Sequence, residues 1–317
     1  MDEQYDVVVI GAGPAGLNAA LVLARARRRV AVVDAGQPRN ASAAHLHGFL
    51  SRDGMAPAAL LAAGRAEVAG YGGRLIEGRV DRVDPGFVVH LADGAPLRTR
   101  RVLLATGLRD ELPGIPGVRE RWGRDVLHCP YCHGYEVRDQ PIGVLATGPA
   151  SVYHALLVRQ WSADVVLFAH DVDVCGEERE RLTACGIRIV DGEVGRLVVD
   201  GDRLRGVELA DGLVVPRSAV FVGPRMVSND SLLTSLGCER DQDGWVTTDA
   251  AGRTSVPGVW AVGNVADQRA QLITSAAAGA KAGIDINQDL LDEDIDEALR
   301  RRRGRSSVEA AAARRAS

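Results

Sequence analysis

The hydrophobic pattern near the N-terminus predicts a strand, a helix and a second strand in succession. A short, continuous apolar run, Val7–Ile10, ends in glycines and is followed by Ala15–Ala26, which is rich in helix-forming residues. A second apolar run, Val30–Val33, comes next. Continuous apolar runs of this length are typical of strands that are buried on both faces of a parallel sheet.

The same pattern occurs once more, in Ile142–Ala146, Val152–Trp161 and Val165–Phe168. Two such units predict an α/β fold with two Rossmann-like domains. The β-rich stretches Arg79–Leu91 and Arg196–Val215 carry or adjoin Asp-Gly turn signals, and we expect them to be antiparallel additions to the parallel cores.

Size and charge exclude several classes of protein. The 317 residues exceed one average domain of ~150 residues, which favours two domains. A net charge of -4, spread along the chain, gives no reason to expect nucleic acid or a membrane surface as a partner.

Of the five cysteines, Cys129 and Cys132 form a CxxC, and Cys175, Cys185 and Cys238 are expected to be small apolar fillers.

The two ends of the sequence bear on location. Met1–Asp6 is acidic and leads directly into an apolar strand, whereas a secretory signal needs a basic segment before its apolar stretch. No apolar run approaches the ~18 residues of a spanning helix. We therefore expect a cytoplasmic protein without a membrane span. From Leu299 onward, where arginine and alanine dominate, we expect a frayed helix and tail without a nucleic-acid role.

The segment Gly11–Gly16 reads GAGPAG, a GxGxxG loop placed between a strand and a helix. Gly11 permits the tight turn, Gly13 lets the backbone approach a pyrophosphate, and Gly16 lets the helix pack closely on the strand. Asp34 closes the next strand. Its separation from the glycine loop is close to the ~20 residues expected of an acid that binds ribose hydroxyls. Together these features predict a dinucleotide site.

Three segments carry a resemblance to the low-molecular-weight thioredoxin reductases. They are the GPAG ending of the first loop, the sequence Ala105-Thr106-Gly107 after an apolar strand, and Gly258–Val265, which is similar to that family's C-terminal flavin motif except that Asn264 replaces Asp. The resemblance implies that the dinucleotide is FAD, that Gln271 lies near the flavin ring and that the protein is a homodimer.

The resemblance also implies a domain organisation. Residues 1–110 and 242–300 would form a discontinuous FAD-binding domain, and residues 111–241 an inserted domain that carries the CxxC on a degenerate NADPH-type framework. Residues 301–317 would be a tail.

The CxxC reads Cys129-Pro130-Tyr131-Cys132 and is flanked by His128 and His133. A nearby imidazolium or a helix N-terminus stabilises a thiolate, so thiol pKa values can fall from ~8.5 to between ~3.5 and ~7.5. Zinc is the alternative ligand. A structural zinc site usually needs four ligands, and no second CxxC or suitable histidine pair follows. We therefore interpret the pair as redox-active and expect no metal site.

The residues around the CxxC narrow the resemblance. His133 stands where thioredoxin reductases have Asp, and this variant is similar to the flavin-dependent dithiol oxidases that close disulfides in dithiolopyrrolones, epidithiodioxopiperazines and related natural products. Arg39, Asn40 and the segment from His47 to Leu50 resemble the flavin-side loop of that subgroup.

A thioredoxin reductase also needs a second glycine loop for NADPH, and here that loop is eroded. In the corresponding stretch, residues 146–151, Ala146 replaces the first glycine and Pro149 removes an amide donor. Where the family has arginines for the 2′-phosphate, this chain has Asp171 and Asp173. The alternative, that NADH or another donor still binds, is left open by the sequence.

The hypothesis is an FAD-dependent oxidase that forms a disulfide in a small dithiol, with O2 as electron acceptor and hydrogen peroxide as product. A substrate thiolate attacks Cys129. The resemblance implies that Cys132 then passes the electrons to FAD. His133 either acts as the base or only orients the loop. The alternatives are an NAD(P)H-dependent disulfide reductase and a flavin-bound redox sensor.

The residues expected to form the site fall into two groups. Those expected to carry the chemistry are Cys129, Cys132 and His133. Those expected to hold FAD are Gly11, Gly13, Pro14, Ala15, Gly16, Asp34, Arg39, Asn40, His47, Ala105, Thr106, Gly107, Asn264, Val265 and Gln271.

Overall fold

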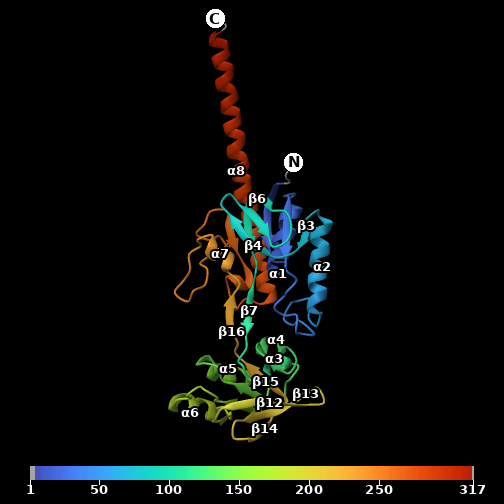
Figure 1. Cartoon of the computed structure of the whole chain (residues 1–317), viewed down its shortest axis with the longest axis vertical. Coiled ribbons are helices and arrows are strands. Elements are labelled where there is room, and N and C mark those ends of the chain that lie inside the picture. The colour runs from blue at the N-terminus through green and yellow to red at the C-terminus, as the bar shows by residue number, and fades with distance from the viewer. Residues whose placement is uncertain (1–3, 316–317) are drawn as a thin grey trace. The chain divides into compact units, whose positions relative to one another are not determined.

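The computed structural model describes the backbone of residues 4–315 and the side chains of residues 4–303. The chain forms two compact units, each assembled from separate segments (Figure 1). The first unit comprises Met1–Gln37, Leu61–Gly107 and Ser228–Ser317, and the second comprises Pro38–Leu60 and Leu108–Val227. Relative to the expected domain ranges, Pro38–Leu60 goes with the unit that carries the CxxC, and residues 228–241 go with the other unit.

The first unit is built on a seven-stranded sheet with the order β3-β2-β1-β6-β5-β4, in which β17 also pairs with β6. The pairs β1–β2, β1–β6, β2–β3 and β6–β17 are parallel, whereas β4 and β5 are added in antiparallel fashion. The strands are β1 (Gln4–Ile10), β2 (Val30–Asp34), β3 (Arg74–Glu77), β4 (Val80–Asp84), β5 (Val88–Leu91), β6 (Leu97–Leu104) and β17 (Val259–Ala261).

The apolar run of β1 fills the core on both faces of this sheet. Val7 and Val9 pack in one cluster with residues of the helices α1 and α8, and Val8 and Ile10 pack in a second cluster on the other face. Successive side chains of a strand point to opposite faces, so a continuous apolar run is what a strand covered on both sides requires. The α/β fold predicted from the sequence is confirmed, including the antiparallel additions.

The helices α1 and α8 approach each other closely because glycines face the contact. A Cβ atom on Gly279 would lie 1.9 Å from the carbonyl oxygen of Ala15, and one on Gly283 would lie 2.9 Å from that of Ala19. The helices that belong wholly or mainly to this unit are α1 (Pro14–Arg25), α2 (Pro57–Gly70), α7 (Ser231–Ser235), the 3-10 turn η1 (Gly263–Val265) and α8 (Leu272–Arg315). Glycine on α8 thus fixes the position of α1, which begins at the first glycine loop.

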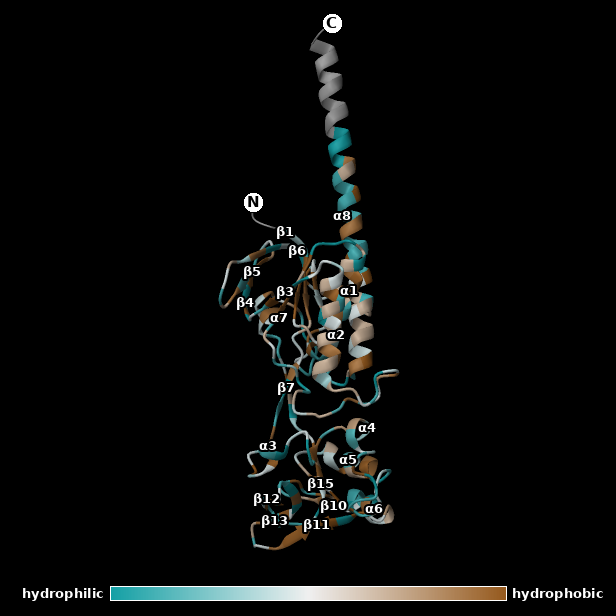
Figure 2. Ribbon diagram, turned by 90° about the vertical axis from the view of Figure 1, so that its right-hand side faces the viewer, coloured by the Kyte–Doolittle hydropathy of each residue, from teal (hydrophilic) through white to brown (hydrophobic). Residues whose placement is uncertain are grey.

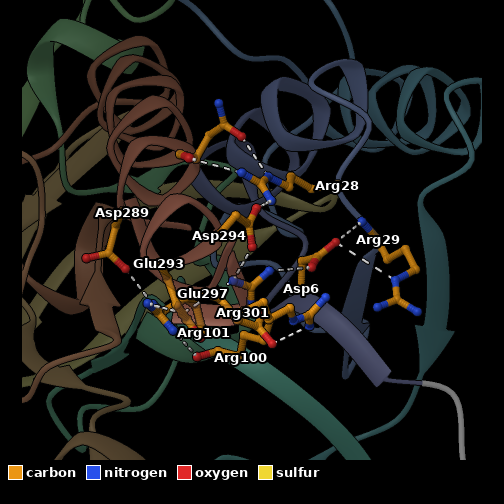
Figure 3. Close-up of polar contacts among 11 residues, drawn as sticks. Asp6, Arg28, Arg29, Arg100, Arg101, Asp289, Glu293, Asp294, Glu297 and Arg301 are labelled. Carbon is orange, nitrogen blue, oxygen red and sulfur yellow. Dashed lines mark hydrogen bonds and ion pairs between the residues drawn. The ribbon is translucent and has the colours of Figure 1, made fainter. Parts of the chain in front are cut away.

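A network of ion pairs joins α8 to the sheet (Figure 3). Arg100 lies 2.6 Å from a carboxylate oxygen of Asp294 and 3.2 Å from one of Asp6. Arg101 lies 2.5 Å from Asp289. Solvent screens these pairs only in part, because the guanidinium groups of Arg100 and Arg101 are largely buried. The network fixes which side of α8 faces the sheet.

The helix α8 continues to Arg315 as a single element, whereas the sequence predicts a frayed helix and tail from Leu299. Alanine, arginine and glutamate favour helix, and Arg301 forms an ion pair with Glu297 one turn earlier. In Figure 2 the coloured part of α8 is mostly hydrophilic toward its C-terminal end, and more hydrophobic residues lie where α8 runs beside α1. Residues 316–317 lie outside the described residues. No helix in the described part of the chain is long and apolar enough to cross a membrane.

The second unit contains a five-stranded parallel sheet with the order β11-β10-β9-β15-β8. A three-stranded antiparallel sheet, β12-β13-β14, and a two-stranded sheet of β7 and β16 complete it. The strands are β7 (Leu108–Glu111), β8 (Val126–Leu127), β9 (Ile142–Leu145), β10 (Val165–Phe168), β11 (Arg188–Val190), β12 (Val194–Asp200), β13 (Arg203–Leu209), β14 (Val214–Pro216), β15 (Ala219–Val222) and β16 (Arg225–Ser228). The helices are α3 (Val118–Arg121), α4 (Pro130–His133), α5 (Ala150–Val158) and α6 (Gly176–Ala184).

Candidate active site

The first glycine loop joins β1 to α1 and has the shape of an anion cradle. Gly11 has φ of 104°, and a Cβ there would lie 2.4 Å from the carbonyl oxygen of Ala105. A Cβ on Gly16 would lie 1.9 Å from the carbonyl oxygen of Gly11. At Gly13, by contrast, a Cβ would meet no atom within 4 Å. The first and last glycines are therefore required by the fold, and the middle one leaves room for a ligand, as a pyrophosphate at the N-terminus of α1 needs.

Asp34 holds the first loop from the end of β2. One of its carboxylate oxygens accepts a hydrogen bond from the backbone N–H of Ala12 at 3.1 Å, and the other pairs with Arg65 on α2. The sequence predicts that Asp34 binds ribose hydroxyls. The structure adds a structural role, because the same carboxylate fixes the loop and carries a cationic partner. Sequence reasoning missed Arg65, since no motif connects α2 to this strand.

The segment Ala105–Gly107 follows β6 directly beside the first loop. The backbone N–H of Ala105 donates to the carbonyl oxygen of Ile10 at 2.8 Å. Asn229 then holds the segment from the other side: its amide nitrogen donates to the Thr106 carbonyl at 2.9 Å, and the Thr106 hydroxyl donates to the Asn229 carbonyl at 2.7 Å. Asn229 is a further residue that the sequence does not reveal, because it lies far from these residues along the chain.

Asn264 lies in η1, just before α8. Its amide nitrogen donates to the carbonyl oxygens of Asp267 and Ala270, both at 3.0 Å. A carboxylate has no hydrogen to donate in this way. Asparagine in place of the family's aspartate therefore closes the turn that leads to Gln271 and α8. Val265, the next residue, is fully buried.

Cys129 and Cys132 form a disulfide, with their Cα atoms 5.2 Å apart. Cys129 caps the short helix α4, and its carbonyl oxygen accepts hydrogen bonds from the N–H groups of Cys132 and His133, both at 3.1 Å. Trp161 packs on this turn, since a Cβ on Gly134 would lie 2.8 Å from its indole ring. The predicted pairing within the CxxC is present in the structure.

The other three cysteines differ in burial. Cys238 is buried, as expected of an apolar filler, whereas Cys175 and Cys185 are exposed. The prediction of burial was wrong for these two, because both lie at the ends of α6, where the chain faces solvent.

Burial acts in the same direction on the two histidines that flank the CxxC, favouring the neutral imidazole over the imidazolium. Burial lowers the pKa of His128 and of His133, which opposes the imidazolium form that the sequence suggested as a stabiliser of the thiolate. His128 contacts the Val222 carbonyl through Nδ1 at 3.2 Å and packs edge-on against His154, whose pKa burial lowers to about 4. In this disulfide form, burial opposes the imidazolium beside the cysteines, and its role next to a thiolate stays a prediction. A neutral imidazole suits a proton acceptor.

His133 lines a small hollow of about 120 Å³ on the second unit. The hollow brings together two parts of that unit: the turn that follows the CxxC and the segment Pro38–Leu60. Its lining consists of Ala44, His45, His47, Gly123, Arg124, Leu127, His133, Glu136 and Val137. The candidate base therefore lines a cavity in which other ionisable side chains also lie.

Arg39 and His47 form ion pairs with residues of the second unit. Arg39 forms a two-pronged ion pair with Asp110, with distances of 2.8 and 2.7 Å. His47 lies between two carboxylates, those of Asp53 and Glu136. The contact of Arg39, Asn40 and His47 with the flavin that the resemblance implies stays a prediction.

In the second glycine loop, between β9 and α5, polar groups of the loop form hydrogen bonds with one another. The N–H of Thr147 donates to the hydroxyl of Ser151 at 3.0 Å, and the N–H of Ser151 donates to the carbonyl of Gly148 at 3.0 Å. Pro149 caps α5 and has no N–H. A phosphate at a helix N-terminus is held by such N–H groups, so this loop has lost donors that a nucleotide would need.

The turn after β10 is equally unsuited to a phosphate. The ring nitrogen Nδ1 of His170 accepts a hydrogen bond from the N–H of Val194 at 3.0 Å, so the ring proton of the neutral form is on Nε2, which lies 3.2 Å from the Asp171 carboxylate. The histidine is therefore held toward an acidic neighbour, and Asp171 itself is exposed. This arrangement repels a 2′-phosphate.

Comparison with known proteins agrees with the fold. The profile of the pyridine nucleotide-disulphide oxidoreductase family matches residues 5–280. The crystal structure of HlmI is 61% identical, covers 95% of this chain and 97% of that chain, and superimposes with a TM-score of 0.93. Thioredoxin reductase sirT of Leptosphaeria maculans is 31% identical over 92% of this chain and 96% of its own length. The thioredoxin reductase structure from Streptococcus pyogenes is 25% identical, covers 92% of this chain and all of its own, and has a TM-score of 0.83.

This chain belongs to the pyridine nucleotide-disulphide oxidoreductase family. Its relatives are thioredoxin-reductase-like, and it is a flavin-dependent thiol/disulfide oxidoreductase with FAD as its cofactor. The first glycine loop fits that cofactor, because the space at Gly13 is open while the flanking glycines hold the turn.

Replacing the glycines of the first loop separates cofactor binding from folding. In Gly13→Ala the new methyl group occupies only the open space, so we expect FAD binding to weaken by about tenfold or more, about 1.4 kcal/mol, while the melting temperature of the flavin-free protein stays unchanged. In Gly16→Ala the methyl group meets the Gly11 carbonyl, so the flavin-free protein itself should melt earlier. FAD titration and thermal melts measure both quantities.

Gly114→Ala is the matched control, since a Cβ at Gly114 meets nothing within 4 Å and that residue, like Gly13, lies outside the helices and strands. It should change neither quantity. Undiminished FAD affinity in Gly13→Ala would show that the pyrophosphate does not lie against this loop.

Proposed function

We propose that this protein is an FAD-dependent oxidase that forms a disulfide in a small dithiol, with O2 as the electron acceptor and H2O2 as the product. The observation that carries the proposal is the contrast between the two glycine loops. The first is open at Gly13, whereas the second has Pro149 at its turn and hydrogen bonds between Thr147, Gly148 and Ser151. A flavoprotein without a working nucleotide site must take its electrons from another donor, and the CxxC suits a dithiol.

The cysteines carry the thiol chemistry. A substrate thiolate attacks Sγ of Cys129, a sulfur–sulfur bond to the substrate forms, the Cys129–Cys132 bond breaks, and Cys132 leaves as a thiolate. The second substrate thiol loses its proton and attacks the substrate sulfur of this mixed disulfide, which releases the cyclic disulfide and the Cys129 thiolate. The protein then holds both electrons as a reduced cysteine pair.

When bound, FAD supplies the acceptor for those two electrons and passes them to O2. By family resemblance, Cys132 is the cysteine on the flavin side. The residues proposed to hold FAD are those of the first loop and Asp34, together with Arg39, Asn40, His47, Ala105, Thr106, Gly107, Asn264, Val265 and Gln271. We further propose that the enzyme is a cytoplasmic homodimer.

His133 is the proposed base for the substrate thiol. It follows Cys132 directly and lines the hollow on the second unit. Burial lowers its pKa and so favours the neutral ring, the form that can accept a proton. A role in orienting the loop is the alternative to proton transfer.

The rival function is that of an NAD(P)H-dependent disulfide reductase. It is favoured by the names of relatives such as the thioredoxin reductases of Leptosphaeria maculans and Listeria innocua. The two functions differ in the electron donor, so a reduction experiment distinguishes them.

In the absence of oxygen, a small dithiol should bleach the flavin absorbance of this protein, and NADPH or NADH should bleach it slowly or not at all. The physical reason is that Pro149 and the internal hydrogen bonds of the second loop leave too few donors for a pyrophosphate, while Asp171 and Asp173 repel a phosphate. Anaerobic spectrophotometric titration measures this. Rapid, stoichiometric bleaching by NADPH would support the reductase instead.

Both cysteines should be required, in different steps. Cys129→Ser should lose bleaching by dithiols, because the attacked sulfur is gone. Cys132→Ser, given a substrate-type disulfide, should accumulate a mixed disulfide on Cys129, detectable by mass spectrometry, because the thiol that would resolve it is absent. Cys175→Ser, which changes an exposed cysteine at the start of α6, serves as the control and should behave like the wild type. Normal bleaching by the Cys132→Ser variant would exclude the two-cysteine relay.

A further inference from the structure

The hollow beside His133 contains ionisable groups that the proposed reaction has not used. Besides His133 itself, its lining includes the imidazoles of His45 and His47, the guanidinium of Arg124 and the carboxylate of Glu136. Arg124 is already paired with Asp202 at 2.8 Å. The carboxylate of Glu136 comes from the turn that directly follows α4, the helix that contains Cys132.

A chain of contacts holds Glu136 from the other side of the hollow. The Nε2 atom of His47 lies 3.4 Å from a carboxylate oxygen of Glu136, and Nδ1 of the same ring lies 3.3 Å from Asp53. The backbone N–H of Gly48 donates to the other oxygen of Asp53 at 2.9 Å. Hydrogen bonds to Gly48 and His47 lower the pKa of Asp53, which favours the carboxylate form that accepts a hydrogen bond from His47.

The segment that carries His47 is fixed to the second unit. Leu46 is buried, and its backbone exchanges hydrogen bonds with Gly54 and Met55 at 2.9 and 2.8 Å. Ser42 packs tightly on Gly123, because a Cβ at Gly123 would lie 2.8 Å from the Cβ of Ser42. The backbone that carries His47 is therefore ordered and packs on the second unit.

We propose that Glu136 is a positioning residue for His133, and that His47, anchored on Asp53, holds the Glu136 carboxylate at the hollow that His133 lines. The inference rests on the proposed function, in which His133 takes the proton of a substrate thiol and becomes an imidazolium. A carboxylate at the same hollow stabilises that cation, whereas burial alone opposes its formation.

The charges around His133 give the direction of the effect. Burial lowers the pKa of His133, Glu136 raises it, and His47 lowers it further. His45 and Arg124 complete the ionisable groups of the lining. Removing the Glu136 charge leaves burial unopposed, so the pKa of His133 should fall, and a weaker base should take up the substrate proton less readily.

The test is an NMR titration of the histidine side chains in the oxidised, FAD-loaded enzyme, with His133→Ala used to assign the His133 signal among the seven histidines. In Glu136→Gln the pKa of His133 should be lower than in the wild type by about 0.5 or more. Glu136→Asp, which keeps the charge, should restore most of that difference. Glu177→Gln removes one exposed carboxylate from α6 of the same unit and should leave the pKa of His133 unchanged.

The pH profile of flavin bleaching by a dithiol gives a second readout. In the wild type the rate should rise with pH as His133 loses its proton. In Glu136→Gln that rise should move to lower pH while the plateau rate falls severalfold, a combination that mere loosening of the turn does not produce. His133→Ala should lose about 10²-fold in rate and show no such rise, with a deficit that shrinks as pH approaches the substrate thiol's own pKa.

The outcomes separate the inference from the proposed function. An unchanged His133 pKa in Glu136→Gln would overturn the positioning role, whether or not the protein oxidises dithiols. A lowered pKa in an enzyme that takes up no oxygen with any dithiol would retain the electrostatic coupling between Glu136 and His133 but exclude the oxidase. Because the Glu136 side chain is 43% exposed, the substitution leaves the core intact, and retained flavin absorbance verifies this.

Discussion

The backbone of the first glycine loop lies so close to its neighbours that two of its three glycines admit no side chain, and the cofactor site depends on this constraint. Gly11 touches the segment after β6, and Gly16 touches Gly11 itself. A similarly close approach occurs between the helices α1 and α8, where Gly279 of α8 meets the backbone of Ala15 in α1. The N-terminus of α1 is thus fixed from two sides, and only Gly13 leaves an opening. A preformed opening of this kind lets a pyrophosphate bind to the end of a helix without rearrangement of the loop.

The second unit repeats the strand–turn–helix arrangement but fills the turn with its own atoms. The Ser151 hydroxyl takes the N–H of Thr147, and Pro149 supplies no donor. Two turns of similar origin therefore differ in the one property that phosphate binding needs, the supply of backbone N–H groups. This difference, rather than any added residue, is the physical basis of the proposed oxidase, in which electrons enter through the cysteines.

The sequence predicted the elements and motifs that depend on local pattern. The apolar runs Val7–Ile10 and Ile142–Ala146 became central strands, and the CxxC formed its disulfide. The contacts of Asn229 with Thr106 and of Arg65 with Asp34 could not be predicted, because each joins residues that only the tertiary fold brings together. Burial was the other missing quantity: it lowers the pKa of both flanking histidines, whereas the sequence suggested an imidazolium.

The central claim is that dithiol oxidation by this protein is coupled to oxygen through FAD without a pyridine nucleotide. The most direct measurement is oxygen uptake by the purified FAD-loaded enzyme, supplied with a small dithiol in nucleotide-free buffer, with disulfide and peroxide quantified in the same sample. The account predicts sustained turnover in which each O2 consumed yields one disulfide and one H2O2. Uptake that stops after a single equivalent, or that begins only when NADPH is added, would contradict it.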